Sequence, residues 1–127
     1  MKRIPEIEVN DMKKWEKYLD ELLIKGLVDI RKQAAFFSAR KLPNGEFGLC
    51  LLCLKDNVLN IYDTDMKQNI GMLMYSVDLT KVTNYKASTF MLNSYLKFTY
   101  DGYDYKFVDC VMKSFYEAVK SEVVRNN

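Results

Sequence analysis

Three cysteines are the first residues whose type and spacing could support chemistry. Cys50 and Cys53 have the C-x-x-C spacing found in redox and zinc sites, whereas Cys110 lies far along the chain. A zinc or redox pair needs both sulfurs to converge, and zinc needs further ligands. The apolar run 47–54 is typical of a buried strand, where side chains three residues apart point to opposite faces. An odd number of cysteines without an export signal also favours reduced thiols, so we predict that these thiols are core residues.

Carboxylates are the second candidate group. Asp63 and Asp65 alternate in a polar loop, and Asp101 and Asp104 flank a later turn. Such pairs can act as general acid and base. Alternating acids are also found in calcium loops, but residues 63–69 lack the glycine and the terminal glutamate of an EF-hand. Solvated turns explain both pairs, and an enzyme that uses these carboxylates is kept as an alternative.

The chain has no histidine. This excludes Ser-His-Asp and Cys-His nucleophiles and histidine metal sites. No glycine-rich phosphate-binding motif is present either. The sequence therefore predicts a protein that is not an enzyme and that has no metal site and no cofactor.

The charge balance is nearly even, with 19 basic and 17 acidic residues and a net charge of +2. A nucleic-acid binder usually has a larger basic excess or a basic stripe, so we predict no nucleic-acid partner. No apolar run reaches the roughly 20 residues that a membrane span needs. The basic residues Lys2 and Arg3 are not followed by the apolar segment that a signal peptide needs. We therefore expect a cytoplasmic protein without a transmembrane segment.

The elements that must position these residues follow from hydrophobic spacing. An N-terminal helix is predicted over 10–26, where apolar residues including Trp15 and Leu22 recur at spacings of three and four and Gly26 provides a stop. Antiparallel strands are predicted over 33–108, of which 34–41 is weakly marked. The turns at Asn44-Gly45 and Asp56-Asn57 separate the first strands.

The Asp101-Gly102 pair is a strong signal for a two-residue hairpin turn. Such a turn sets the register of the two strands. Three pairs should then face the core: Tyr100 with Tyr103, Phe98 with Tyr105, and Leu96 with Phe107. Two pairs should face solvent: Thr99 with Asp104, and Lys97 with Lys106.

A C-terminal helix is predicted over 109–125, with Asp109 as its N-cap. Its apolar stripe should close the open end of a curved sheet, seated on the aromatic face of the Asp101-Gly102 hairpin. The residues of that stripe are Val111, Met112, Phe115, Val119 and Val123, with Tyr116 at its edge.

The order of these elements resembles the bacterial PH-like (pleckstrin-homology-like, GRAM-type) superfamily. The hairpin 51–62, the segment from Tyr75 to Val82, and the hairpin 95–108 that runs into a capped helix carry the resemblance. It implies one PH-like domain over 1–127, of α+β and mainly β class. The expected architecture is a partly open antiparallel barrel of about seven strands with a C-terminal capping helix and an extra N-terminal helix.

The resemblance implies a binding module and leaves the ligand open. The first hypothesis is a protein or peptide partner, including a second copy of the chain, at a surface formed by Trp15, Phe115, Tyr116 and Val119. The alternative is weak binding of an anionic lipid or phosphoinositide headgroup at Arg40 and Lys41, with peripheral membrane contact. The carboxylate enzyme is the third hypothesis.

Overall fold

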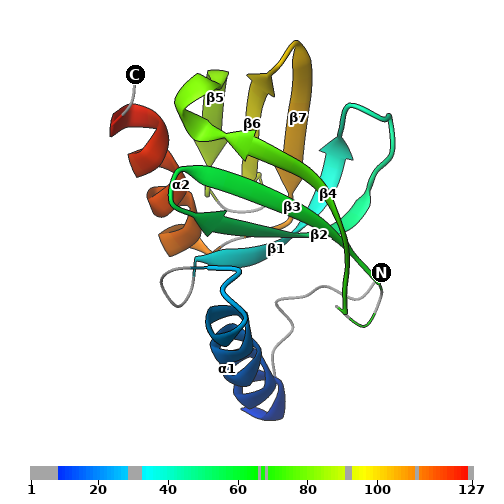
Figure 1. The fold of residues 1–127 in the computed structure, drawn as a ribbon. Helices are drawn as coiled ribbons and strands as arrows, with labels where there is room; N and C mark the ends of the chain where they lie inside the picture. The colour runs from blue at the N-terminus through cyan, green and yellow to red at the C-terminus, as the bar shows by residue number, and fades with distance from the viewer. Residues whose placement is uncertain are drawn as a thin grey trace.

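The computed structural model describes residues 9–28, 33–65, 67, 69–90, 93–110 and 112–125, with side chains from residue 17 to residue 123. Seven antiparallel strands form one sheet in the order β4-β3-β2-β1-β7-β6-β5 (Figure 1). The elements are α1 (Val9–Ile24), β1 (Ala34–Lys41), β2 (Gly48–Lys55), β3 (Val58–Thr64), β4 (Ile70–Asp78), the 3-10 turn η1 (Leu79–Lys81), β5 (Thr83–Ser88), β6 (Tyr95–Tyr100), β7 (Tyr103–Val108) and α2 (Lys113–Arg125).

The sheet curves so strongly that its two parts cross. In Figure 1, β1 to β4 run across β5 to β7, and α2 lies at one end between them. The sheet stays open because β4 and β5 are the two ends of the strand order. This architecture confirms the predicted fold class, a mainly β, partly open antiparallel barrel with a C-terminal helix and one additional N-terminal helix.

Strand β1, the most weakly marked in the sequence, is the central strand of the sheet. It pairs with β2 on one side and with β7 on the other. Every residue from Ala34 to Ala39 is buried. Both faces of the strand are covered, so its sequence lacks the alternation of a half-buried strand. This burial explains why the pattern signal was weak.

The β6–β7 hairpin forms in the predicted register, with Tyr100 opposite Tyr103 and Lys97 opposite Lys106. Asp101 and Gly102 have φ values of 53° and 81°, as a type I′ turn requires. The inner pairs from Leu96 to Phe107 are buried, whereas Tyr103 at the tip is 53% exposed. The predicted core face therefore holds except at the turn itself.

The C-terminal helix begins at Lys113, four residues later than predicted. Asp109 is not its N-cap, because this residue adopts a left-handed φ of 65° and lies before the helix. The backbone N–H of Phe115 donates to the carbonyl of Met112 at the helix start. The helix aromatics contact Phe37 of β1, with ring centroids 5.6 Å away for Phe115 and 5.7 Å away for Tyr116. Val111 lies outside the described residues.

Helix α1 covers the outer face of β1 and β2, where it forms a second core. Leu19 and Leu22 of the helix pack with Phe36 and Leu51 of these strands. The helix ends at Ile24, and Gly26, the glycine predicted to stop it, follows with a φ of 74°. The N–H groups of Gly26 and Leu27 donate to the carbonyls of Leu23 and Leu22, which is a Schellman motif.

The outer core gives a direct test of whether α1 is part of the folded unit. Leu22 is 1% exposed, so Leu22→Ala should lower the free energy of unfolding by about 2–5 kcal/mol through loss of apolar contact and a residual cavity. Ile24 on the same helix is 83% exposed, so Ile24→Ala should change that energy by about 0.5 kcal/mol or less. Urea denaturation of both variants measures the difference. Equal effects would show that α1 does not pack on the sheet.

Candidate functional site

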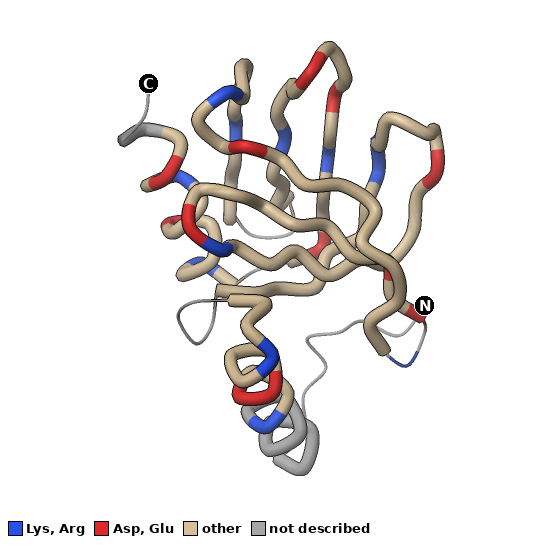
Figure 2. The backbone as a smooth tube through the Cα atoms, viewed as in Figure 1, with Lys and Arg blue, Asp and Glu red and all other residues tan. Residues whose placement is uncertain are grey.

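Four lysines lie side by side across four neighbouring strands. Lys86 of β5 is opposite Lys97 of β6, Lys97 is opposite Lys106 of β7, and Lys106 is opposite Lys41 of β1. All four side chains are exposed. In Figure 2 they form a series of blue bands at one level across these strands. We call these four residues the lysine row.

A bulge in β1 adds a fifth cation to one end of the row. The β1–β7 register shifts between Ala39 and Lys41, so Arg40 and Lys41 together oppose Lys106. Ala39 and Leu42 on either side of them are buried in the inner core. A bulge of this kind turns two consecutive side chains outward. The structure therefore joins the predicted headgroup residues Arg40 and Lys41 to three lysines from the far half of the sheet.

An aromatic ring supports the middle of the row. The ammonium groups of Lys97 and Lys106 lie 5.8 Å and 6.0 Å from the ring centroid of Tyr95. Cations at this distance are attracted by the face of the ring. Tyr95 itself pairs with Ser88 and Val108 of the neighbouring strands. The ring thus helps to hold two like charges that face each other directly.

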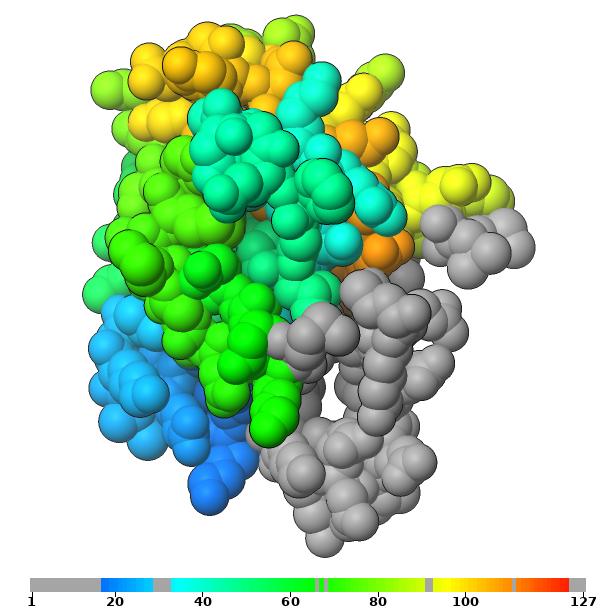
Figure 3. Space-filling model, turned by 90° about the vertical axis from the view of Figure 1, so that its right-hand side faces the viewer, coloured from blue at the N-terminus to red at the C-terminus, as the bar shows by residue number. Residues whose placement is uncertain are grey.

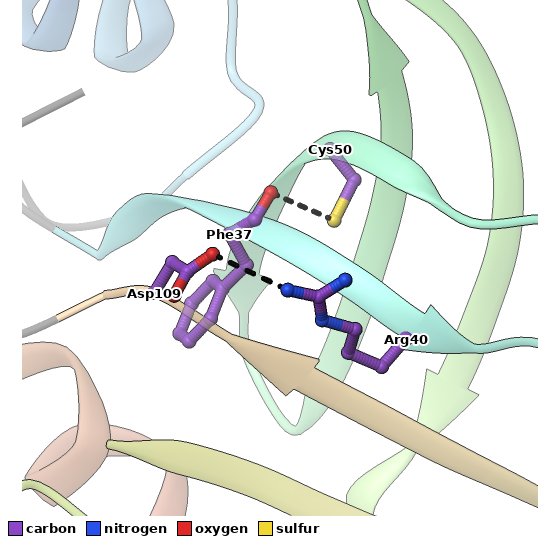
Figure 4. A network of polar contacts seen from close by, with 4 residues as sticks. All are labelled: Phe37, Arg40, Cys50 and Asp109. Carbon is purple, nitrogen blue, oxygen red and sulfur yellow. Dashed lines mark hydrogen bonds and ion pairs between the residues drawn. The ribbon is translucent and has the colours of Figure 1, made fainter. Parts of the chain in front are cut away.

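Two acids border the row, and each has a partner. Asp109 forms an ion pair with Arg40 at 3.9 Å, with side chains that are 46% and 56% exposed (Figure 4). Asp104, two residues before Lys106, accepts a hydrogen bond of 2.7 Å from the hydroxyl of Thr99. An exposed ion pair of this length is weak. The row therefore keeps an excess of positive charge.

Three residues proposed from sequence as a partner surface are core residues instead. Phe115, Tyr116 and Val119 are 0%, 5% and 0% exposed. The hydroxyl of Tyr116 donates to the carbonyl of Cys110 at 2.7 Å, which fixes the start of α2. Their stripe faces the barrel interior because a helix must bury its apolar face. The side chain of Trp15, in the first turns of α1, lies outside the described side chains.

The three thiols are buried, and the C-x-x-C pair does not converge. Cys50 belongs to the inner core and Cys53 to the outer core, which confirms that their side chains lie on opposite faces of β2. The Cys50 thiol donates to the carbonyl of Phe37 at 3.6 Å (Figure 4). Burial raises the pKa values of Cys50 and Cys53 to about 12 and that of Cys110 to about 11.

The carboxylates of the 63–69 loop hold the loop together. Asp65 accepts hydrogen bonds from the backbone N–H groups of Lys67 and Asn69 and from the Asn69 side chain. The Asn69 side chain contributes most to lowering the pKa of Asp65, so this carboxyl is ionised at neutral pH. Asp63 accepts from the N–H of Met72 at 2.6 Å. Both carboxylates stabilise the turn between β3 and β4, because each accepts hydrogen bonds from backbone N–H groups of its own hairpin.

The buried thiols should be almost inert. A thiol whose pKa lies near 11 or 12 carries little thiolate at pH ~8. We expect Ellman's reagent to modify the native protein at least about a hundredfold more slowly than the protein in denaturant. Rapid labelling of one native thiol would contradict the burial that the fold assigns to it.

The lysine row should lower the stability of the fold. Lys97 has a like charge directly opposite on each side, so Lys97→Gln should raise the free energy of unfolding by about 0.5 kcal/mol. The gain should shrink in ~0.5 M salt, which screens exposed charges. Lys120→Gln on the exposed side of α2 is the matched control and should give no gain. Denaturant titrations at low and high salt would refute the repulsion if Lys97→Gln gave no gain at low salt.

Comparison with known proteins identifies the fold. No family model and no curated sequence matches the chain. The Slm1-PH domain in complex with inositol-4-phosphate superposes with a TM-score of 0.53 at 13% identity, covering 74% of this chain and 94% of that chain. The Slm1-PH domain in complex with phosphoserine gives a TM-score of 0.50 at 14% identity, covering 72% of this chain and 90% of that chain. The bacterial, GRAM-type assignment stays a prediction, but the chain has the PH-like fold that its sequence resemblance implied.

Proposed function

We propose that this protein is a non-catalytic binding module for anionic lipid headgroups and that the lysine row, with Arg40, is its contact surface. The observation that carries the proposal is the direct cross-strand alignment of Lys41, Lys86, Lys97 and Lys106. Like charges that face each other across strands destabilise a sheet. An anionic ligand reduces the repulsion between these lysines. Relief of this unfavourable electrostatic energy therefore favours binding of a negatively charged partner.

The structural neighbours support the choice of ligand. The Slm1-PH structures contain inositol-4-phosphate in one case and phosphoserine in another, and both of these are phosphorylated anions. The same chemistry fits a row of ammonium groups, which bind phosphate as point charges. Among the described residues, no helix has the length and apolar character needed to cross a membrane. A cytoplasmic location stays a prediction.

The chemistry of the described residues supports a module without catalysis. The thiols are protonated by burial, and Asp65 is held ionised by its loop. A general acid or an activated nucleophile needs the opposite shifts. At Asp65, one residue of the carboxylate-enzyme alternative, the carboxylate oxygens are bonded to the loop's own N–H groups.

A protein or peptide partner is the second candidate, with a different location from that predicted. Strand β4 ends the strand order, and Met72 and Leu73 on it are 76% and 49% exposed. An edge strand with exposed apolar side chains can accept an added strand. A second copy or an extended peptide at β4 would protect its backbone amides from hydrogen exchange in a concentration-dependent manner.

The lipid proposal is tested by sedimentation with vesicles. The protein should bind phosphatidylcholine vesicles that contain ~30 mol% phosphatidylserine or a phosphoinositide, and binding should fall as salt rises from ~0.1 M to ~0.5 M. Replacing Lys97 and Lys106 by Gln should weaken the partition coefficient by roughly 30-fold, since each cation near the surface contributes about 1 kcal/mol.

The control is a double variant on another face. Lys113 and Lys120 lie on exposed positions of α2, and their replacement by Gln keeps the net charge equal to that of the row variant. This control should bind nearly as well as the wild type. Loss of binding by the same factor in both variants would show that only net charge matters and would reject the row as the site. The absence of any binding at low salt would reject the function.

A further inference from the structure

Resting on the proposed function, we infer that the ligand is the plane of an anionic bilayer, on which the lysine row docks while two exposed rings beside it insert, Phe47 between β1 and β2 and Phe90 just after β5.

The shape of the row favours a surface. Neighbouring strands lie about 4.8 Å apart, so four lysines on four strands extend over roughly 14 Å. The four lysines are aligned by the pairing of their strands, and Figure 2 shows blue bands at a similar height on neighbouring strands of this part of the sheet. Charges spread in this way match several headgroups in a plane better than one compact phosphorylated ring.

An exposed phenylalanine lies at the β1 end. Phe47 is 77% exposed and precedes Gly48, which pairs with Ala39. It therefore lies just beyond the last pair of the β1–β2 ladder, as does Arg40, the additional cation of the bulge, on the other strand. A ring of this size in full contact with water is unfavourable unless it finds an apolar environment.

A second exposed phenylalanine lies two residues after the end of β5. Phe90 is 69% exposed, and its N–H donates to the hydroxyl of Ser88. Ser88 is the cross-strand partner of Tyr95, whose ring lies beneath the ammonium groups of Lys97 and Lys106. Figure 3 shows the segment after β5, in yellow, projecting from the edge of the molecule. Phe90 thus follows Ser88 by two residues and lies four residues along the chain from Lys86.

Cations and exposed aromatic rings together select a bilayer over other anions. A soluble inositol phosphate or an acidic polymer offers charge but no apolar layer. A bilayer offers both, since lysines contact the headgroups and aromatic side chains bury at the boundary with the acyl chains. Charge complementarity places the row on the membrane, and the two rings define how the sheet face is oriented on it.

Two measurements test the inference: partitioning of variants onto vesicles, and the depth to which the two side chains insert into the bilayer. Phe47→Ala with Phe90→Ala should weaken partitioning onto vesicles with ~30 mol% phosphatidylserine by about tenfold, because apolar burial is lost while every cation stays. Met72→Ala is the matched control, since Met72 is 76% exposed on β4 at the far edge of the sheet. It should bind like the wild type. Stability should be unchanged in all three replacements.

Insertion is measured with tryptophan. Phe90→Trp and Phe47→Trp should each give a blue-shifted emission that brominated phosphatidylcholine in the same vesicles quenches, after subtraction of the signal of Trp15. Met72→Trp should show neither effect. Soluble inositol hexakisphosphate should displace the protein from vesicles only at concentrations at which it screens charge generally. The concentration required should be the same for the phenylalanine variants as for the wild type.

The outcomes separate the inference from the function on which it rests. Vesicle binding that needs Lys97 and Lys106 but shows no quenching at positions 47 and 90 would overturn the planar docking and leave headgroup binding intact. Stoichiometric binding of the soluble inositol phosphate would do the same. Binding of an acidic polymer but not of vesicles would point to a protein partner and overturn the inference. No binding of any anion would overturn both.

Discussion

The pairing of β1 with β7 is the contact on which the rest of the molecule depends. It joins the meander β1 to β4 to the meander β5 to β7, and no other ladder does so in the described sheet. It also places Phe37 beside Phe107, with ring centroids 6.0 Å apart, at the centre of the inner core. Helix α2 packs on this aromatic pair. Without the pairing, two small sheets would each leave one apolar face in water.

The same ladder builds the charged surface. The bulge at its end lets Ala39 and Leu42 both face the core while Arg40 and Lys41 face outward. The bulge therefore keeps the apolar side chains on the inner face of the sheet and adds cations to the lysine row on its outer face. Bulges are common where a sheet re-aims side chains for a purpose. The repulsion within the row is tolerable because the core beneath it is well packed and Tyr95 lies against two of the charges.

The two cores divide the sheet into surfaces with different roles. Helix α1 covers the outer face of β1 and β2, so this part of the sheet is closed to ligands. The outer face of β5 to β7 has no such cover in the described residues, and it is there that the lysines lie. The extra helix thus restricts where an outer-face ligand can bind. Phe115, Tyr116 and Val119 of α2 are buried in the inner core, so they are not available to a partner.

Local signals in the sequence determined much of this structure. The Asp101-Gly102 turn set the register that places Lys97 opposite Lys106, and Gly26, the glycine predicted to stop α1, follows its end at Ile24. The position of Cys50 and Cys53 on opposite faces also followed from strand geometry alone. Each of these features depends on contacts between residues close in sequence, so their spacing is enough.

Long-range pairing decided the rest. Lys41 and Lys106 are far apart in the chain, and nothing in their local sequence shows that a bulged β1 meets β7 there. Lys86 joins the row only because β5 pairs with β6 around its own irregularity. The sequence showed one lysine pair on a solvent face, and its nearly even charge balance gave no sign of a stripe. Only the closure of the sheet, driven by burial of the aromatic core, brought the other cations into line with that pair.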